Sequence, residues 1–254
     1  MLDASKLFDL AGQVAVVTGA SRGLGRGLAG ALAGAGAEIV AVSRHPAEAL
    51  SADVERLGGR CLSLTADLRD PAQVDEVIPR ALAAAGRVDI LVNNAGTTAR
   101  GPAIEVTPEA WHHVLQVNLH AVFTLCQAAA KAMLPRRRGK IINVASLMSF
   151  EGGINVSPYT ASKGAVGQLT KALANEWAPL GINVNAIAPG YVATDMTRPL
   201  QEDATRNPTI LARIPAGRWG RPEDFAGAVV FLAAGASDYV HGHVLVVDGG
   251  WLAR

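Results

Sequence analysis

Residues 14–25 read VAVVTGASRGLG, a run of valines that passes directly into glycines spaced as Gly-x-x-x-Gly-x-Gly. The valine run predicts a buried strand, and the glycines predict a tight turn into a helix. At such a turn backbone N–H groups can approach a pyrophosphate, which also meets the partial positive charge of the helix N-terminus. The stretch lacks the Lys-Ser/Thr ending of a P-loop. It therefore favours dinucleotide binding over ATP or GTP hydrolysis.

The same succession of strand and helix repeats along the whole chain. Short β-branched runs alternate with longer segments rich in alanine and leucine, and several runs lack polar alternation, as strands covered on both faces do. The pattern predicts a single-domain doubly wound Rossmann fold over residues 1–254, an α/β fold with a seven-stranded parallel sheet flanked by helices. The expected strands are Val14–Thr18, Glu38–Ser43, Cys61–Thr65, Ile90–Asn93, Lys140–Ala145, Ile182–Ile187 and His243–Val247, and the expected helices cover 24–35, 47–57, 71–85, 108–134, 158–178 and 222–234.

Composition argues against several other classes of protein. The 254 residues carry 23 basic and 22 acidic side chains, so no strong field attracts nucleic acid or a membrane surface. No apolar run reaches the ~18 residues of a membrane span, and the amino terminus has no secretory signal core. Cys61 and Cys126 lie far apart in apolar stretches, and the six histidines form no metal-ligand array. We expect a cytoplasmic protein without a metal site.

One long segment, residues 189–221, has no clear periodicity and is rich in proline, arginine and glycine. It follows an expected strand, and ligands of doubly wound sheets bind beyond the carboxyl ends of the strands. Long irregular segments inside a compact domain are usually mobile or functional. We therefore expect a substrate lid here rather than an inert loop.

The end of the second expected strand determines which nicotinamide dinucleotide fits. A carboxylate there would bind the adenosine ribose and repel a 2′-phosphate, but the residues are Ser43, Arg44 and His45. Arg44 can pair with a phosphate or stack on adenine. The residues thus favour NADP over NAD, and the alternative is a solvated arginine at a strand end.

Four polar residues indicate acid–base chemistry. Tyr159 and Lys163 lie four residues apart at the start of an expected helix, so both project from one face. A phenol with a pKa near roughly 10 is a weak base, and a neighbouring ammonium favours its ionised form. Ser146 ends the fifth expected strand, where its hydroxyl can bind a substrate carbonyl. Asn118 can hold a water beside Lys163 and connect it to solvent. Together they predict catalysis at an alcohol or ketone.

In this order, the motifs resemble those of the short-chain dehydrogenase/reductase superfamily across essentially the whole chain. The resemblance implies that Tyr159 is the acid/base and that Lys163 lowers its pKa and binds the ribose. It also implies that Ser146 orients the substrate and that Asn118 sustains the proton relay. The matching motifs are Thr18-Gly19-x-x-x-Gly23-x-Gly25, Asp67, Asn94-Ala95-Gly96, Asn118, Ser146, Tyr159-x-x-x-Lys163 and Pro189-Gly190.

The same resemblance implies a cofactor site built from the loops that follow successive strands. Asp67 is expected to contact the adenine edge, and Thr194 the nicotinamide carboxamide. Members of the superfamily are commonly tetramers, so we expect a homotetramer. The expected cofactor-binding residues are Gly19, Ser21, Arg22, Gly23, Leu24, Gly25, Ser43, Arg44, Asp67, Leu68, Asn94, Ala95, Gly96, Tyr159, Lys163, Pro189, Gly190, Val192 and Thr194.

Longer stretches resemble a narrower group, the 2-dehydro-3-deoxy-D-gluconate 5-dehydrogenases and gluconate 5-dehydrogenases. This resemblance implies reversible oxidation of a hydroxyl on a sugar acid, although many members of that group are described as using NAD. A sugar acid needs a cation for its carboxylate. Arg100, Arg198 and Arg213 lie in loops that can reach the site, and the sequence does not choose among them. The stretches are KIINVASLMSFEGG (140–153), ANEWAPLGINVNAIAPGY (174–191), RIPAGRWG (213–220) and VDGGWLAR (247–254).

Two other functions stay open. A reductase of other carbonyls, including those bound to an acyl carrier protein, would need a basic docking patch beside the cleft. A catalytically silent regulator would need the phosphate loop, but it would not need Tyr159 and Lys163 together. A sugar-nucleotide epimerase is disfavoured because the chain leaves no sizeable carboxyl-terminal domain.

Overall fold

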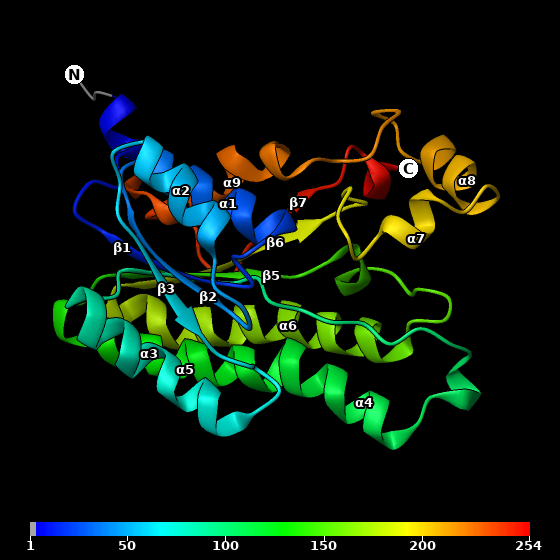
Figure 1. The fold of residues 1–254 in the computed structure, drawn as a ribbon, viewed down its shortest axis with the longest axis horizontal. Coiled ribbons are helices and arrows are strands. Elements are labelled where there is room, and N and C mark those ends of the chain that lie inside the picture. Colours follow the sequence, from blue (N-terminus) through cyan, green and yellow to red (C-terminus); the bar gives the residue numbers. More distant parts are fainter. Residues whose placement is uncertain (1–3) are drawn as a thin grey trace.

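The computed structural model describes residues 4–254 and places one parallel sheet between two layers of helices (Figure 1). The strand order is β3-β2-β1-β4-β5-β6-β7, and all neighbouring strands are parallel. The doubly wound, seven-stranded Rossmann fold is thereby confirmed. The strands are β1 (Val14–Thr18), β2 (Glu38–Ser43), β3 (Cys61–Thr65), β4 (Ile90–Asn93), β5 (Gly139–Val144), β6 (Ile182–Pro189) and β7 (Val244–Val247).

Helices cover both faces of the sheet, with α1, α2 and α9 on one side and α3 to α6 on the other (Figure 1). Each face has its own core, because successive side chains of a strand point to opposite faces. Ile39 of β2 packs in the core with Leu28 of α1, whereas its neighbour Val40 packs with Leu125 of α5. Among residues 4–254, no helix combines the length and apolar character needed to cross a membrane. The helices are α1 (Gly23–Gly34), α2 (Glu48–Arg56), α3 (Pro71–Ala85), α4 (Pro108–Leu115), α5 (Ala121–Met133), α6 (Ser157–Trp177), α7 (Arg198–Gln201), α8 (Arg206–Arg213) and α9 (Ala226–Ala233).

Most expected boundaries hold within two residues, but the helix expected over 108–134 is not α-helical throughout. It consists of α4 and α5 joined by a π-helical turn, Gln116–His120. A π-turn inserts a residue into the helical hydrogen-bond ladder and is frequent at functional sites. The helix expected over 222–234 also divides, into a short 3-10 turn, Pro222–Phe225, followed by α9.

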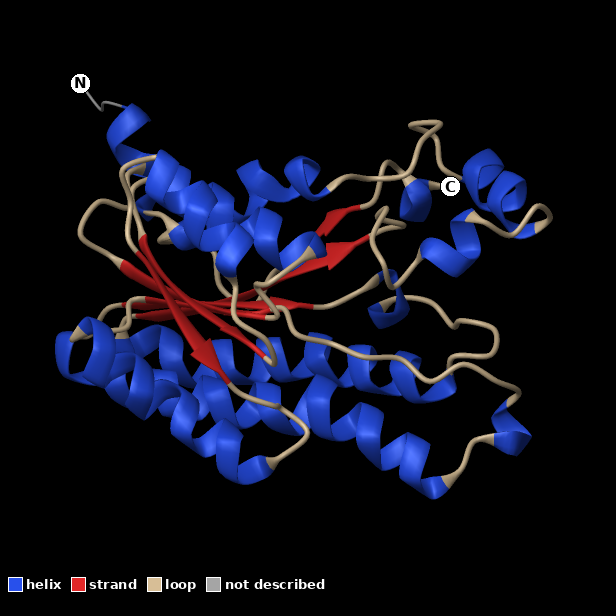
Figure 2. Ribbon diagram, viewed as in Figure 1, coloured by secondary structure: helices blue, strands red, loops and turns tan. Residues whose placement is uncertain are grey.

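The segment expected to be irregular, residues 189–221, contains two short helices, α7 and α8. Leu200 and Ile210 from these helices are buried with Leu147, Ile214 and Trp251 in a small cluster of their own. The helices therefore gain stability from residues far away in the sequence, which is why local periodicity does not reveal them. They lie where the arrows of β6 and β7 end (Figure 2).

The direction of winding reverses between β1 and β4, which lie side by side. Ligands of open α/β sheets bind at such a switch point, beyond the carboxyl ends of the strands. Most of the expected site residues lie at the carboxyl ends of β1 to β6 or in the segments that directly follow these strands. Asn118, Tyr159 and Lys163 come from helices that border the same edge. The fold thus gathers the candidate residues at one edge of the sheet.

Candidate active site

The loop after β1 requires glycine at two positions. Gly19 has a φ of +68°, which side chains rarely allow, and a Cβ at Gly25 would lie 2.2 Å from the Gly19 carbonyl oxygen. Arg22 then occupies the N-cap position of α1, and no described side chain caps the first turn of that helix. Its N–H groups are therefore suited to bind an anion. The expected phosphate loop has the geometry that a pyrophosphate needs.

A dense set of hydrogen bonds joins this loop to the end of β4. The Thr18 hydroxyl accepts from the N–H groups of Asn94 and Ala95, each at 3.0 Å. The Asn94 side-chain amide donates to the Thr18 carbonyl at 2.9 Å. Asn94 therefore has a structural role in bracing the switch point, in the place where the sequence predicts a cofactor contact.

The base of the segment 189–221 lies directly over the loop after β1. A Cβ at Gly23 would lie 3.5 Å from the methyl group of Thr194. The Arg22 guanidinium donates to the Asp195 carboxylate at 3.2 Å. Val192 is buried and forms a bridge with Gly220, which closes the base of the segment. Residues expected to bind the pyrophosphate and the nicotinamide are therefore neighbours.

At the end of β2, Ser43 is buried and its hydroxyl donates to the His45 carbonyl at 2.7 Å. Arg44 is exposed, so its guanidinium is accessible to a phosphate or to solvent. Neither residue carries a negative charge that would repel a 2′-phosphate.

The carboxylate of Asp67, which is expected to contact adenine, already binds another side chain of the protein. The Arg69 guanidinium donates to both Asp67 oxygens, and this hydrogen bond is the largest cause that lowers the pKa of Asp67. The charge of Arg44 lowers that pKa further. Leu68 is buried, and its carbonyl accepts from Gln116 on the π-helical turn. Arg69 is not among the expected site residues, although its position two residues after Asp67 could have indicated this contact.

Tyr159 and Lys163 project from the first turns of α6, with the Lys163 Nζ 5.8 Å from the centre of the Tyr159 ring. Lys163 is only 4% exposed, and its amine donates to the Val144 carbonyl at 2.6 Å. Burial lowers the pKa of Lys163 to about 8. The amine is therefore less strongly held in its charged form than a surface lysine.

The sequence predicts that Lys163 lowers the pKa of Tyr159, but in the structure this pKa lies above its usual value. Burial raises the pKa of Tyr159, while a hydrogen bond with Ser146 and the charge of Arg100 oppose that rise. The physical reason is that burial destabilises the phenolate and the ammonium alike. Ser146 is 8% exposed, follows β5, and also accepts from the Met148 N–H at 3.2 Å.

Asn118 lies within the π-helical turn and is completely buried. Its side chain accepts from the Thr97 N–H at 2.8 Å and donates to the Thr97 carbonyl at 2.9 Å and to the Ser162 hydroxyl at 3.0 Å. Both amide hydrogens thus have partners within the protein. A Cβ at Gly96 would lie 3.5 Å from Asn118 Oδ1 and 3.9 Å from Lys163 Nζ, so the three residues are neighbours.

The structure distinguishes Arg100, Arg198 and Arg213, which the sequence offers equally as partners for a substrate carboxylate. Arg198 pairs with Asp195, and Arg213 pairs with Glu151 at 3.1 Å. Among the described residues Arg100 has no ion-pair partner, and its charge lowers the pKa of Tyr159. Of the three arginines, Arg100 is therefore the one whose guanidinium is left available to a substrate carboxylate.

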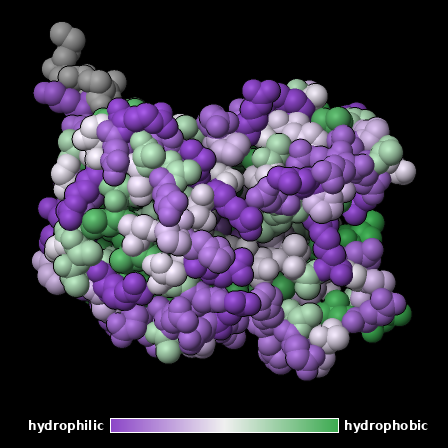
Figure 3. Space-filling view, in the orientation of Figure 1, coloured by the Kyte–Doolittle hydropathy of each residue, from purple (hydrophilic) through white to green (hydrophobic). Residues whose placement is uncertain are grey.

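The Arg213 guanidinium, by contrast, also lies 4.0 Å from the centre of the Trp251 ring. The Trp251 indole in turn donates to Glu151 at 2.8 Å. Glu151 thus ties the loop after β5 to α8 and to the carboxyl-terminal segment. Polar side chains cover most of the displayed face around these segments (Figure 3).

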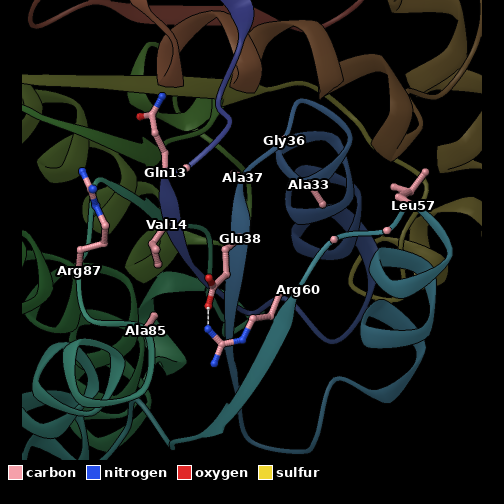
Figure 4. A pocket seen from close by; sticks show the side chains of 13 residues that line it. Gln13, Val14, Ala33, Gly36, Ala37, Glu38, Leu57, Arg60, Ala85 and Arg87 are labelled. Atoms are coloured by element: carbon pink, nitrogen blue, oxygen red, sulfur yellow. Dashed lines mark ion pairs between the residues drawn. The ribbon is translucent and has the colours of Figure 1, made fainter.

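A hollow of about 360 Å³ lies at the opposite, amino-terminal edge of the sheet. Its lining includes the Glu38–Arg60 ion pair, which has a separation of 2.8 Å, together with Gln13 and Arg87 (Figure 4). Within the described part of the chain its lining contains none of the expected site residues. We therefore place the candidate active site where Ser146, Tyr159 and Lys163 converge, and not at this hollow.

Comparison with known proteins gives one family and full-length relatives. A family model described as enoyl-(acyl carrier protein) reductase matches residues 19–252. The chain is 53% identical to the 2-dehydro-3-deoxy-D-gluconate 5-dehydrogenase of Escherichia coli K12, over 97% of this chain and 98% of the relative. The similarity thus covers both the loop after β1 and the segment 189–221.

Two solved structures have the same fold over nearly the full chain. A candidate 2-deoxy-D-gluconate 3-dehydrogenase from Agrobacterium tumefaciens, with bound NADP, is 51% identical with a TM-score of 0.93, covering 98% of this chain and 99% of its own. A gluconate 5-dehydrogenase from Burkholderia cenocepacia, in complex with NADP and tartrate, is 42% identical with a TM-score of 0.95, covering 99% and 100%.

Proposed function

Because this chain belongs to the short-chain dehydrogenase/reductase family, we propose that it is an NAD(P)-dependent oxidoreductase acting on a sugar acid. The reaction interconverts a secondary alcohol and a ketone, of the 2-dehydro-3-deoxy-D-gluconate 5-dehydrogenase or gluconate 5-dehydrogenase type. The observation that carries this proposal is the convergence of Tyr159 and Lys163 with Ser146 at the end of β5. Among the described residues Arg100 has no ion-pair partner, which leaves its guanidinium available to a carboxylate. Full-length relatives with these activities support the substrate class.

The residues present fit a nicotinamide dinucleotide. The uncapped start of α1 suits the pyrophosphate, and the carboxylate-free end of β2 suits a 2′-phosphate. When bound, the cofactor exchanges a hydride with the substrate carbon. NADP is the preferred form on the evidence of Ser43 and Arg44, and related structures that contain NADP support this choice. The proposed binding residues are Gly19, Ser21, Arg22, Gly23, Leu24, Gly25, Ser43, Arg44, Asp67, Leu68, Asn94, Ala95, Gly96, Tyr159, Lys163, Pro189, Gly190, Val192 and Thr194.

In this proposal Tyr159 moves the proton at the substrate oxygen. Its raised pKa keeps the hydroxyl protonated near neutral pH, ready to donate to a carbonyl oxygen. For oxidation the phenol oxygen has to accept the proton of the alcohol. The Ser146 hydrogen bond and the Arg100 charge both favour the ionised form that this direction requires.

Lys163 and Asn118 support that proton transfer. With a pKa of about 8, the Lys163 amine can give and take a proton close to neutral pH. Asn118 fixes the Thr97 backbone beside it. We assign Asn118 a part in the relay through this placement, because both of its amide hydrogens already have protein partners.

Arg100 supplies the recognition that separates a sugar acid from a neutral polyol. A guanidinium can form two parallel charge-assisted hydrogen bonds with a carboxylate, which fixes both position and orientation. Bound in this way, the carboxylate end of the substrate would direct a hydroxyl further along the chain toward Tyr159 and Ser146.

We further propose that the enzyme is a homotetramer in the cytoplasm. Family membership supports the tetramer, as do the exposed aromatic side chains of Trp111 on α4 and Phe123 on α5. Light scattering on the purified protein tests the assembly, and a monomer at micromolar concentration would contradict it.

The function is tested by initial rates with NADP and NAD on sugar acids and on matched neutral polyols. We expect reduced nicotinamide to form from gluconate or 2-dehydro-3-deoxy-D-gluconate, and the polyols to react at least tenfold more slowly. Equal rates on the polyols would contradict the assigned substrate class. The description of the matching family model favours a second candidate, an acyl carrier protein substrate, and an acyl thioester included in the same screen would identify it.

A further inference from the structure

Ser162 lies between the two chemically active residues of α6, three positions after Tyr159 and one before Lys163. It is 0% exposed. Its hydroxyl donates to the Tyr159 carbonyl at 2.7 Å and accepts from the Asn118 side-chain amide at 3.0 Å. The Ser162 hydroxyl thus donates one hydrogen bond and accepts another within the protein, and because it is buried it is not accessible to substrate or solvent.

These two bonds belong to a longer connection. Asn118 holds the Thr97 backbone by two further hydrogen bonds, at 2.8 and 2.9 Å. Thr97 follows Gly96, which borders the Lys163 amine. Through Ser162, the catalytic turn of α6 is therefore connected to the loop after β4 across the π-helical turn.

We propose that Ser162 is a positioning residue that sets the Tyr159 hydroxyl and the Lys163 amine against the Gly96–Thr97 loop. The inference rests on the proposed function and deepens it. Removal of the Ser162 hydroxyl leaves a buried amide hydrogen of Asn118 without a partner. The amide then turns or admits water, the hold on Thr97 loosens, and the Tyr159 carbonyl loses its side-chain donor.

The helix offers a matched control two turns further on. Thr170 is also 0% exposed, its hydroxyl donates to the Val166 carbonyl at 2.8 Å, and it accepts from the Asn143 side-chain amide at 3.0 Å. The pattern is that of Ser162, a backbone carbonyl on one side and an asparagine amide on the other. Only the connection to the catalytic turn differs.

The experiment compares Ser162→Ala with Thr170→Val in the full-length protein, first by denaturant unfolding. Both variants should lose stability, since both leave an asparagine amide unpaired. Kinetics then separate them. Ser162→Ala should lower kcat by about 10- to 100-fold, with KM for substrate and cofactor affinity within about twofold. Its pH profile should also move. Thr170→Val should keep kcat and the pH profile of the parent within about twofold.

A spectroscopic arm does not depend on the identity of the substrate. The chain has only three tyrosines, so ring-carbon NMR of ¹³C-labelled tyrosine resolves Tyr159 once Tyr159→Phe has assigned it. We expect Ser162→Ala to shift that resonance and Thr170→Val to leave it in place. Equal effects of the two variants, in kinetics and in the resonance, would overturn the inference. A parent that turns over no sugar acid contradicts the proposed function instead, while the resonance still tests Ser162.

Discussion

The turn of α6 that carries Tyr159 and Lys163 and the proposed lid segment, residues 189–221, border the same candidate site but are held in opposite ways. Around Asn118, Ser162 and Lys163, which are 0–4% exposed, the contacts are buried hydrogen bonds, several of them to backbone carbonyls. The lid depends on exposed ion pairs, among them Arg22–Asp195, whose side chains are 70% and 47% exposed. Water and salt screen such pairs and so weaken them. By contrast, breaking a buried hydrogen bond costs free energy because it leaves a polar group without a partner.

The difference indicates that the two regions have different roles, one in proton transfer and the other in substrate entry. Proton transfer needs groups held in one geometry, and buried bonds that are costly to break provide it. Substrate entry needs a segment that opens at low cost, and screened ion pairs over a small apolar cluster provide that. We propose on this basis that residues 189–221 form a lid. The predictions below test this contrast, from the largest expected effect to the smallest.

Removal of the Tyr159 hydroxyl should have the largest effect. Tyr159→Phe removes the proton donor, and general acid–base catalysis alone contributes about 10²–10⁴-fold. We expect kcat to fall by at least about a thousandfold, with NADP affinity, measured by fluorescence, within about threefold of the parent. Turnover within tenfold of the parent would mean that another group moves the proton.

Lys163→Met tests the burial of the amine through stability. The folded-state pKa of Lys163 is about 8 against 10.5 for an unperturbed lysine. The unfolded chain therefore binds more protons between these values, and the free energy of unfolding rises with pH in this window by about 3 kcal/mol.

The measurement is denaturant unfolding of parent and Lys163→Met at pH 7 and pH 10.5. The stability of the parent relative to the variant should increase over this interval, since methionine has no proton to lose. A difference that stays constant with pH would show that the buried amine titrates like a surface lysine.

Arg100→Ala tests recognition of the substrate carboxylate. We expect KM for the sugar acid to rise roughly tenfold or more, since a charge-assisted fork is lost. Rates on neutral polyols should fall less, because they lose only the effect of the Arg100 charge on the ionisation of Tyr159. Arg198→Ala provides the matched control, because Arg198 is already paired with Asp195. If the control raises KM as much as Arg100→Ala does, the carboxylate lies against the lid instead.

Substitutions at the end of β2 should change the preference between NADP and NAD. Ser43→Asp introduces the carboxylate that repels a 2′-phosphate and should shift the preference toward NAD by roughly tenfold. Arg44→Ala should weaken NADP binding only a few-fold, because Arg44 is exposed and screened. Binding constants for both cofactors at one salt concentration check this. Tighter binding of NAD by the parent would contradict the preference.

The smallest effect is expected in the lid. Asp195→Asn removes a charge shared by Arg22 and Arg198. We expect faster hydrogen exchange over residues 189–221 and a change in KM of only a few-fold, which salt reproduces in the parent. Equal exchange with and without cofactor and substrate would make the segment a rigid connector.

Much of the fold follows from local sequence. The strands Val14–Thr18, Glu38–Ser43 and Ile90–Asn93 coincide with expectation because their apolar runs are buried on both faces and stop at polar or glycine residues. The π-helical turn at Gln116–His120 was not predicted, since its sequence is compatible with an ordinary helix. There, contacts of Asn118 with Thr97 and Ser162 accompany the altered backbone, and these contacts exist only after folding.

The same distinction applies to the site. Spacing identified Tyr159 and Lys163, and the structure brings both to the end of β5, beside Ser146 and Val144. Spacing did not reveal the raised pKa of Tyr159, which depends on burial. It also did not reveal that Arg213 is occupied by Glu151, 62 residues away along the chain. Partners distant in sequence are the part that only the folded structure provides.

Transfer of deuterium from a labelled sugar acid tests the central claim most directly. Gluconate carrying deuterium at C5 is incubated with the enzyme and oxidised NADP, and the nicotinamide ring is then examined by NMR. The account predicts deuterium on the reduced ring with the parent, a primary isotope effect on the rate, and no detectable transfer with Tyr159→Phe. If the oxidised sugar acid keeps its C5 deuterium, or if Tyr159→Phe transfers it at the parental rate, the account is wrong.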